Sequence, residues 1–315
     1  MKHTLKLTAI LLLMFVVTQF IGLLVIYADP LKIDVISSNG TIEQVSNPYL
    51  TWIAPIEAKT NADFISFFAQ IIIAFIFAIL ILFFLMRFKL KVFVKAWFFL
   101  VVLIALFISF LAFEKLVPFA IELKVALISA FIFALIFAYL KIYKRGVLVH
   151  NFTELLIYPG ISVVFVPLLN IYSILFLLVI ISIYDAWAVW KSGIMQKMAK
   201  YQMNKLDIFS GFLIPYVSKK VKAKMQEMKK SKSKKKIKVN VAILGGGDIV
   251  FPIITAGVIM KSFGLIPAIF VILGATLGLA YLFFFAEKKK FYPAMPFITT
   301  GILLCLALYW VIGFI

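Results

Sequence analysis

Residues 244–248 read Leu-Gly-Gly-Gly-Asp and residues 184–185 read Tyr-Asp, so each pattern ends on an acid within a long apolar stretch. The sequence places Asp185 and Asp248, and no other acid, well inside such stretches. A carboxylate in the hydrocarbon of a bilayer is costly, so an acid there is first a hypothesis of function. Two of them at similar depth predict a pair that shares one proton. We take both as candidate catalytic residues.

The composition excludes a soluble domain. Of the 315 residues, 64% are hydrophobic and only 14% are charged, which is far more apolar than soluble proteins are. Apolar runs of about 20 residues between short charged stretches predict an all-α polytopic membrane protein. We predict about nine spans, at residues 5–27, 64–86, 92–113, 117–140, 153–169, 171–190, 240–260, 264–286 and 293–314. The first run is too long for a signal peptide, so we expect a retained span.

This plan divides the chain into three parts. Residues 1–192 hold spans one to six, with an outer loop at 28–63. Residues 193–239 form a lysine-rich cytosolic loop, and residues 240–315 hold spans seven to nine.

The formal charge of +19 belongs mainly to that loop. Between Lys191 and Lys238 there are fifteen lysines and two acids, a local net charge of +13. A lysine-rich loop beside a span indicates topology first and contact with anionic lipid second. Nucleic acid is not an expected partner, because neither interleaved aromatics nor a binding module is present.

Orientation follows from the same asymmetry. The loop at 28–63 has two lysines against five acids, whereas the loops after spans two, four, six and eight are basic. The positive-inside rule then places the N-terminus in the cytoplasm and the C-terminus outside. In the outer loop, Asn39-Gly40 between short alternating segments predicts a β-hairpin. Asn39-Gly40-Thr41 is also a glycosylation sequon, whose use stays open.

The predicted spans bring the two acids to one side of the membrane. Asp185 lies six residues from Lys191, about 9 Å of helix, and Asp248 lies ten residues from Lys238, about 15 Å. Because spans six and seven run in opposite directions, both carboxyls fall in the cytosolic half of the bilayer. If the helices pack together, the side chains can meet.

Such a pair has a defined chemistry. Two carboxylates a few ångströms apart cannot both ionise cheaply, so one activates a water while the other donates a proton to a peptide carbonyl. This route needs neither a metal nor a cofactor, and we expect none. His3 and His150 are the only histidines, and both lie outside the predicted spans, which disfavours a zinc site or a serine–histidine relay. The one cysteine, Cys305, excludes an intrachain disulfide.

Two segments near the acids have unusual backbones. Each glycine of residues 245–247 costs a helix about 1 kcal/mol relative to alanine. They allow close approach either by a neighbouring helix or by an extended substrate. Pro293-Ala294-Met295-Pro296 opens the ninth span on the same side. It is either an ordinary helix start or an exposed backbone edge beside the acids.

These residues carry a family resemblance. Tyr184-Asp185, Gly245-Gly246-Gly247-Asp248 and Pro293-Ala294-Met295 resemble the YD, GxGD and PAL motifs of presenilins and signal peptide peptidases, in the family's order and in spans six, seven and nine. The cytoplasmic N-terminus and short chain are similar to a microbial presenilin homologue. Met295 stands where the family has leucine, a swap that conserves volume. The resemblance implies that Asp185 and Asp248 are catalytic. The residues that would help to bind substrate are Tyr184, Gly245, Gly247, Pro293, Ala294 and Met295.

Three functions compete at this point. The leading one is an intramembrane aspartyl protease of GxGD type, an aspartic endopeptidase whose partners are transmembrane protein substrates and membrane lipids. A proton- or cation-coupled transporter would use the same aspartates, but it predicts inverted repeats and a polar path through the outer half, and neither is evident. A membrane scaffold leaves the two acids without a purpose. Oligomerisation is compatible with each of them.

Overall fold

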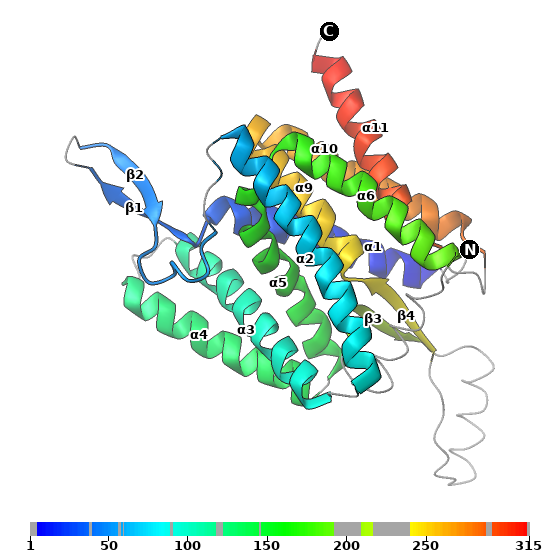
Figure 1. Ribbon diagram of the computed structural model, residues 1–315, viewed down its shortest axis with the longest axis horizontal. Coiled ribbons are helices and arrows are strands. Elements are labelled where there is room, and N and C mark those ends of the chain that lie inside the picture. Colours follow the sequence, from blue (N-terminus) through cyan, green and yellow to red (C-terminus); the bar gives the residue numbers. More distant parts are fainter. Residues whose placement is uncertain are drawn as a thin grey trace.

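The computed structural model describes residues 5–37, 40–55, 58, 60–88, 91–117, 122–144, 146–191, 209–216, 240–287 and 292–313. Within these ranges, nine helices are long and apolar enough to cross a membrane, which confirms the predicted architecture (Figure 1). They are α1 (Leu5–Ala28), α2 (Asn61–Phe88), α3 (Lys91–Leu116), α4 (Leu123–Tyr139), α5 (Val147–Phe165), α6 (Ile171–Trp190), α9 (Gly247–Phe263), α10 (Leu265–Phe285) and α11 (Met295–Gly313). A π-helical turn (Leu140–Lys144) extends α4, and a 3₁₀ turn (Val166–Leu168) follows α5.

The centre of the bundle is formed by α1, α5, α9 and α10, in which α1 and α9 pack on each other and each also packs on α5 and α10. Its core includes Phe15 and Ile253, whose side chains are fully buried. Small residues allow these helices to approach closely, as is usual in membranes. A Cβ on Gly22 of α1 would lie 2.4 Å from Ile253 of α9, and a Cβ on Gly160 of α5 would lie 2.0 Å from a backbone oxygen of α3. These glycines bring α1, α3, α5 and α9 together.

One contact ties α1 to the start of α9. The amide of Gln19, which is fully buried, donates a hydrogen bond to the carbonyl oxygen of Ile249 at 3.1 Å. Hydrogen bonds between helices are one of the forces that hold a membrane bundle together. The first helix is therefore an integral part of the core around residue 249.

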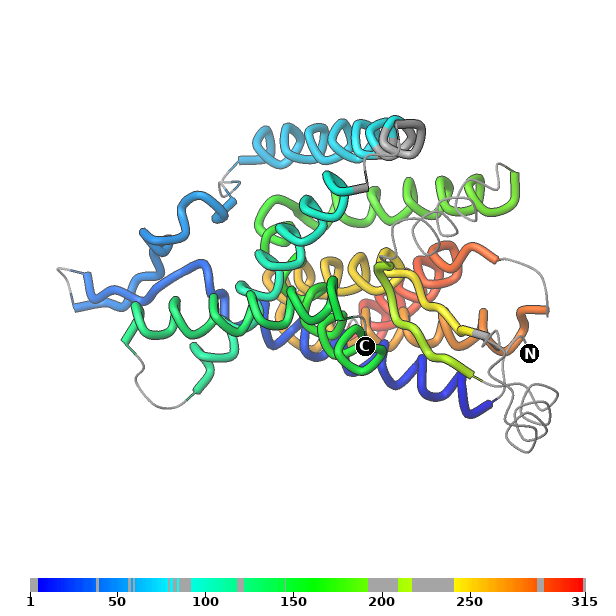
Figure 2. Tube along the Cα trace, turned by 90° about the horizontal axis from the view of Figure 1, so that it is seen from below, coloured from blue at the N-terminus to red at the C-terminus, as the bar shows by residue number. Residues whose placement is uncertain are grey.

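At the edge of the bundle lies α2, as Figure 2 shows. It packs against α6 and the turn after α5. Two aromatic pairs join it to α6: Phe68 with Phe176, whose ring centroids are 5.8 Å apart, and Phe75 with Tyr184, at 5.5 Å. None of the residues Asn61–Ala78, the first part of α2, is buried inside the molecule, so this part of the helix lies on the surface of the bundle.

The loop at residues 28–63 contains the predicted hairpin. Strands β1 (Lys32–Ile36) and β2 (Ile42–Ser46) are antiparallel, with Ile36 opposite Ile42. Gly40 has a φ of +78°, which glycine adopts without strain. Asn39 lies outside the described residues, and the use of its sequon stays open.

A second hairpin corrects the predicted seventh span. Residues 240–245 were expected to begin a helix, but they form strand β4 (Asn240–Gly245), which pairs antiparallel with β3 (Gly211–Tyr216). Val241 and Ile243 are β-branched and favour a strand, while the glycines that follow disfavour a helix, so α9 begins only at Gly247. Of the lysine-rich loop, only residues 209–216 are among the described ones.

The predicted starts of other helices also differ. The fourth span was predicted from residue 117, but α4 begins at Leu123. The fifth span was predicted from residue 153, but α5 begins at Val147. His150 was therefore wrongly placed outside the spans and is buried within this helix. The ninth helix begins at Met295, two residues later than predicted. Pro293 and Ala294 lie before it.

Candidate active site

Asp185 lies on the inner face of α6, five residues before the helix ends at Trp190. Only 6% of the residue is exposed. The backbone N–H of Met295 donates to its Oδ2 at 3.1 Å, and the backbone of Ala294 also hydrogen-bonds to it. These donors lie at the start of α11, one on its first residue and one just before it, where N–H groups have no partner within the helix. The segment Pro293–Met295 is thus both a helix start and a backbone edge beside the acid.

A second bond fixes this arrangement one helical turn away. The hydroxyls of Ser182 on α6 and Thr299 on α11 are 2.7 Å apart. Both side chains are buried, and they lie three or four residues from Asp185 and Met295. Two successive contacts between α6 and α11 therefore hold the Asp185 carboxyl against the start of α11.

Asp248 is the second residue of α9. The sequence placed it about 15 Å along a helix, but it lies in the first helical turn, because the six residues of β4 are extended. The backbone of Gly245 hydrogen-bonds to its carboxyl group, and Asp185 interacts with it electrostatically. Since α6 and α9 pack together, the structure brings both acids to one place, where α11 also arrives.

The three glycines before Asp248 have different surroundings. A Cβ on Gly245 would lie 3.1 Å from Asp248 Oδ2. A Cβ on Gly246 would lie 2.8 Å from both the Ser210 hydroxyl and the Tyr158 hydroxyl, whereas a Cβ on Gly247 meets only Phe251, at 3.9 Å. Gly246 is therefore closed in by protein, and Gly247 adjoins open space.

The remaining predicted residues divide into two groups. Pro293 is buried and Ala294 is half-buried beside Asp185. Tyr184 instead directs its ring toward Phe75 of α2 and toward Trp187, with centroids 5.5 and 6.2 Å apart. Its side chain joins α6 to α2.

Sequence reasoning missed a cluster of buried polar residues next to this site. Lys141, His150, Glu154 and Tyr158 are all at least nine-tenths buried and in contact with one another. Lys141 is one of the basic residues that follow the predicted fourth span, but its ammonium pairs with the Glu154 carboxylate. The available signal was the spacing of residues 150, 154 and 158, which places them on one helical face.

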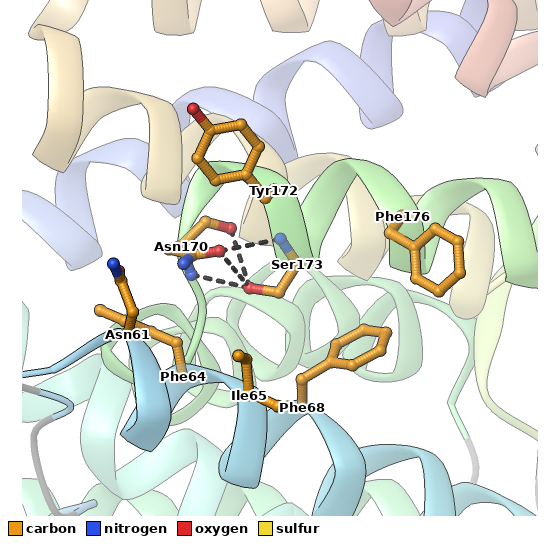
Figure 3. A pocket seen from close by; sticks show the side chains of 8 residues that line it. All are labelled: Asn61, Phe64, Ile65, Phe68, Asn170, Tyr172, Ser173 and Phe176. Atoms are coloured by element: carbon orange, nitrogen blue, oxygen red, sulfur yellow. Dashed lines mark hydrogen bonds between the residues drawn. The ribbon is translucent and has the colours of Figure 1, made fainter.

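A pocket of about 460 Å³ lies between α2 and α6, away from the two acids. Figure 3 shows side chains of α2 and of the first turns of α6 around it. Its lining residues are Asn61, Phe64, Ile65, Phe68, Asn170, Tyr172, Ser173 and Phe176. Phe176 is nine residues before Asp185, about 14 Å along the helix. Since no acid lines the pocket, it is not the candidate active site. Across the described ranges, no group of three or more His, Cys, Asp or Glu is arranged to hold a metal.

Comparison with known proteins agrees with this geometry. The family model described as signal-peptide peptidase, presenilin aspartyl protease matches residues 54–315. The fold is similar to two solved structures of a presenilin-family intramembrane aspartate protease in different space groups. One is 18% identical, with a TM-score of 0.58 over 96% of this chain and 97% of that chain. The other is 17% identical, with a TM-score of 0.57 over 96% of each. No curated protein matches this chain.

The family model covers most of the chain and includes α6, α9 and α11 with both acids. The solved structures share the same fold over nearly the full length. The chain is an integral, multi-pass membrane protein, and it belongs to the presenilin and signal-peptide peptidase family of intramembrane aspartyl proteases.

Proposed function

We propose that this protein hydrolyses peptide bonds of transmembrane helical substrates with a dyad formed by Asp185 and Asp248. The observation that supports the proposal is the packing of α6, which carries Asp185, against α9, which carries Asp248, and against α11, with the two carboxyls near enough to interact electrostatically. Two carboxyls within a few ångströms of each other share one proton. This arrangement supplies a base and an acid in one site.

The reaction then proceeds in two steps. The ionised carboxyl takes a proton from water, and the water oxygen adds to the peptide carbonyl carbon. The protonated carboxyl gives its proton to the carbonyl oxygen, which yields a tetrahedral diol. In the second step the carboxyl that took the proton from water gives it to the leaving nitrogen as the C–N bond breaks, and a diol hydroxyl returns its proton to the other aspartate as the new carboxyl group forms. Two peptides are the products, and both aspartates return to their starting state.

The substrate's scissile segment has to be extended, because the backbone carbonyl of a helix is engaged in its own hydrogen bond. We infer that this segment lies along β4, beside Gly245 and Gly247, and near the Pro293–Met295 segment. In the described part of the chain, β4 pairs with β3 only. Adding a strand to its other edge would use backbone hydrogen bonds and tolerate many substrate side chains. The open space beside Gly247 supports this position.

The orientation is also part of the proposal. The positive-inside rule applied to the basic loops places the N-terminus and the dyad side in the cytoplasm and the C-terminus outside. The positive charge of the lysine-rich loop at 193–239 would also attract the anionic lipid headgroups of the cytoplasmic leaflet. These statements rest on the sequence, since most of that loop lies outside the described residues.

The test is cleavage of a transmembrane peptide by purified protein in liposomes. Asp185→Asn and Asp248→Asn should each abolish cleavage and leave thermal stability unchanged, because asparagine keeps the size of the side chain but cannot exchange the proton. The matched control is Asp29→Asn, which removes an acid that contacts Lys261 near the far end of α9. The control should cleave as the wild type does. Full activity in either dyad variant refutes the assignment.

A further inference from the structure

A row of polar side chains on α5 faces the β3–β4 hairpin. His150, Glu154 and Tyr158 are spaced by four residues and share one face of the helix, and Asn151 lies beside them. Glu154 is 1% exposed. A buried carboxylate is costly unless it is paired and hydrogen-bonded. The catalytic chemistry proposed above does not use the Glu154 carboxylate, so its burial needs another explanation.

Glu154 is fully engaged by its neighbours. Its Oε1 pairs with the Lys141 ammonium, and its Oε2 accepts hydrogen bonds from the Tyr158 hydroxyl and from the Gly211 N–H, the latter at 3.2 Å. His150 Nε2 lies 2.8 Å from the Gly211 carbonyl oxygen. That oxygen can only accept, so Nε2 carries the proton. Both backbone groups of Gly211 are therefore bound by α5.

Asn151 repeats this pattern two residues further along β3. Its Nδ2 donates to the carbonyl oxygen of Leu213 at 2.8 Å, and its Oδ1 accepts from the Leu213 N–H at 3.0 Å. Alternate residues of a strand direct their backbone groups to the same edge. Side chains of α5 thus occupy the edge of β3 that faces away from β4, as a neighbouring strand would.

This attachment continues through the register of the hairpin to Asp248. Gly211 is paired with Gly245, and Leu213 with Ile243. Gly245 in turn hydrogen-bonds to the Asp248 carboxyl. On the other side, Tyr158 and Ser210 enclose Gly246. A shift of β3 along α5 would therefore move the backbone that leads into Asp248.

We propose that Asn151, Glu154 and Tyr158 are positioning residues, which hold the β3–β4 hairpin in register with α5 and so fix Asp248 opposite Asp185. The inference rests on the proposed function, because it takes Asp248 as a catalytic acid. None of the three touches the scissile bond. They act through the hairpin.

The test needs variants that loosen the hairpin but spare the buried charges. Removing Glu154 would leave the Lys141 ammonium without its partner and threaten the fold, so Tyr158→Phe and Asn151→Leu are used instead. Tyr158→Phe deletes only the hydroxyl and keeps the ring that meets Phe212 edge to face at 6.3 Å. Asn151→Leu keeps the side-chain size and deletes both bonds to Leu213.

The matched controls lie on the same helix. Thr153→Val and Ser162→Ala remove buried hydroxyls that bond only to carbonyls of α5 itself. Both controls should keep kcat within about twofold of the wild type. Tyr158→Phe and Asn151→Leu should each lower kcat at least about tenfold. Each variant loses hydrogen bonds that position the hairpin, and a typical net hydrogen-bond energy corresponds to a rate change of about this size.

A spectroscopic readout separates positioning from general stability. Spin labels at the exposed residues Val241 of β4 and Ile183 of α6, in a Cys305→Ser background, report the distance between hairpin and helix. The distribution should be narrow in the wild type and in Thr153→Val, and broad in Asn151→Leu and Tyr158→Phe at temperatures where each variant remains folded.

The outcomes distinguish this inference from the proposed function. If the wild type cleaves but Asn151→Leu and Tyr158→Phe match their controls in kcat or in the width of the distribution, the positioning role is overturned and the protease assignment stands. If the wild type cleaves no transmembrane peptide, the proposed function fails, and the distance distributions alone decide whether α5 holds the hairpin.

Discussion

Alanine at Gly246 and alanine at Gly247 should have opposite consequences, although the two residues are adjacent. A Cβ at Gly246 would lie 2.8 Å from the Tyr158 and Ser210 hydroxyls, whereas ordinary contacts begin at 3.4 Å. Either these groups or the backbone must therefore move by about 0.6 Å. Tyr158 cannot yield easily, since it is 2% exposed and bonded to Glu154.

The cost follows from that displacement. Overpacking a well-packed site typically costs about 1–3 kcal/mol, and we expect Gly246→Ala to lose this much free energy of unfolding. At Gly247 the Cβ would lie 3.9 Å from its nearest neighbour, and alanine is the better helix former. Gly247→Ala should therefore unfold at the wild-type temperature or slightly above it. Its cleavage rate should nevertheless fall, because the new methyl occupies the space assigned to the substrate.

Two quantities are measured for each variant: the thermal unfolding temperature in detergent and the rate at which it cleaves a transmembrane peptide. We expect Gly246→Ala to have the lower unfolding temperature, and Gly247→Ala to cleave slowly although it is as stable as the wild type. A Gly246→Ala protein as stable as Gly247→Ala would refute the packing argument, and a fully active Gly247→Ala protein would refute the position given to the substrate.

Three more predictions use the same assays. The cleavage rate should have a bell-shaped pH profile, since the one-proton state of the dyad dominates only between its two macroscopic pKa values. Metal chelators should have no effect, and loss of activity with a chelator would indicate a metal site instead. Pro293→Leu should favour a regular helix before α11 and reduce cleavage without unfolding the protein, so wild-type cleavage by this variant would exclude the irregular backbone from the mechanism. Gly301→Ala should destabilise the protein by about 1–3 kcal/mol more than Gly313→Ala. A Cβ at Gly301 would lie 2.1 Å from the Gly274 carbonyl oxygen of α10, whereas a Cβ at Gly313 would have nothing within 4 Å. Equal stability of the two variants would show that α10 and α11 are not packed this closely.

Much of the fold was predictable because the membrane imposes a simple physical rule. A span must be about 20 apolar residues long, so the apolar runs in the sequence located all nine helices. The error at residues 240–245 shows the limit of that rule. Hydropathy measures apolarity and not conformation, and an apolar strand before a glycine run has the same hydropathy as the start of a helix.

The polar cluster on α5 was missed for a related reason. Lys141 and Glu154 each lie near the end of a predicted span, where charged side chains are ordinarily solvated. Only the packing of the extended α4 against α5 shows that the two charges neutralise each other inside the protein. By contrast, Asp185 and Asp248 were identifiable individually, because each lies in an apolar stretch that offers it no partner of its own.

The bond from Gln19 to Ile249 makes α1 part of the unit that folds around the two acids. The family model matches from residue 54 onward, so α1 lies before the matched residues. Yet α1 packs against α5, α9 and α10 and donates to the residue that follows Asp248. A chain truncated to the family region would retain both aspartates but expose to lipid the faces of α5 and α9 that α1 covers. The first residue that the family model matches is therefore not a point at which this protein can be truncated without loss of stability.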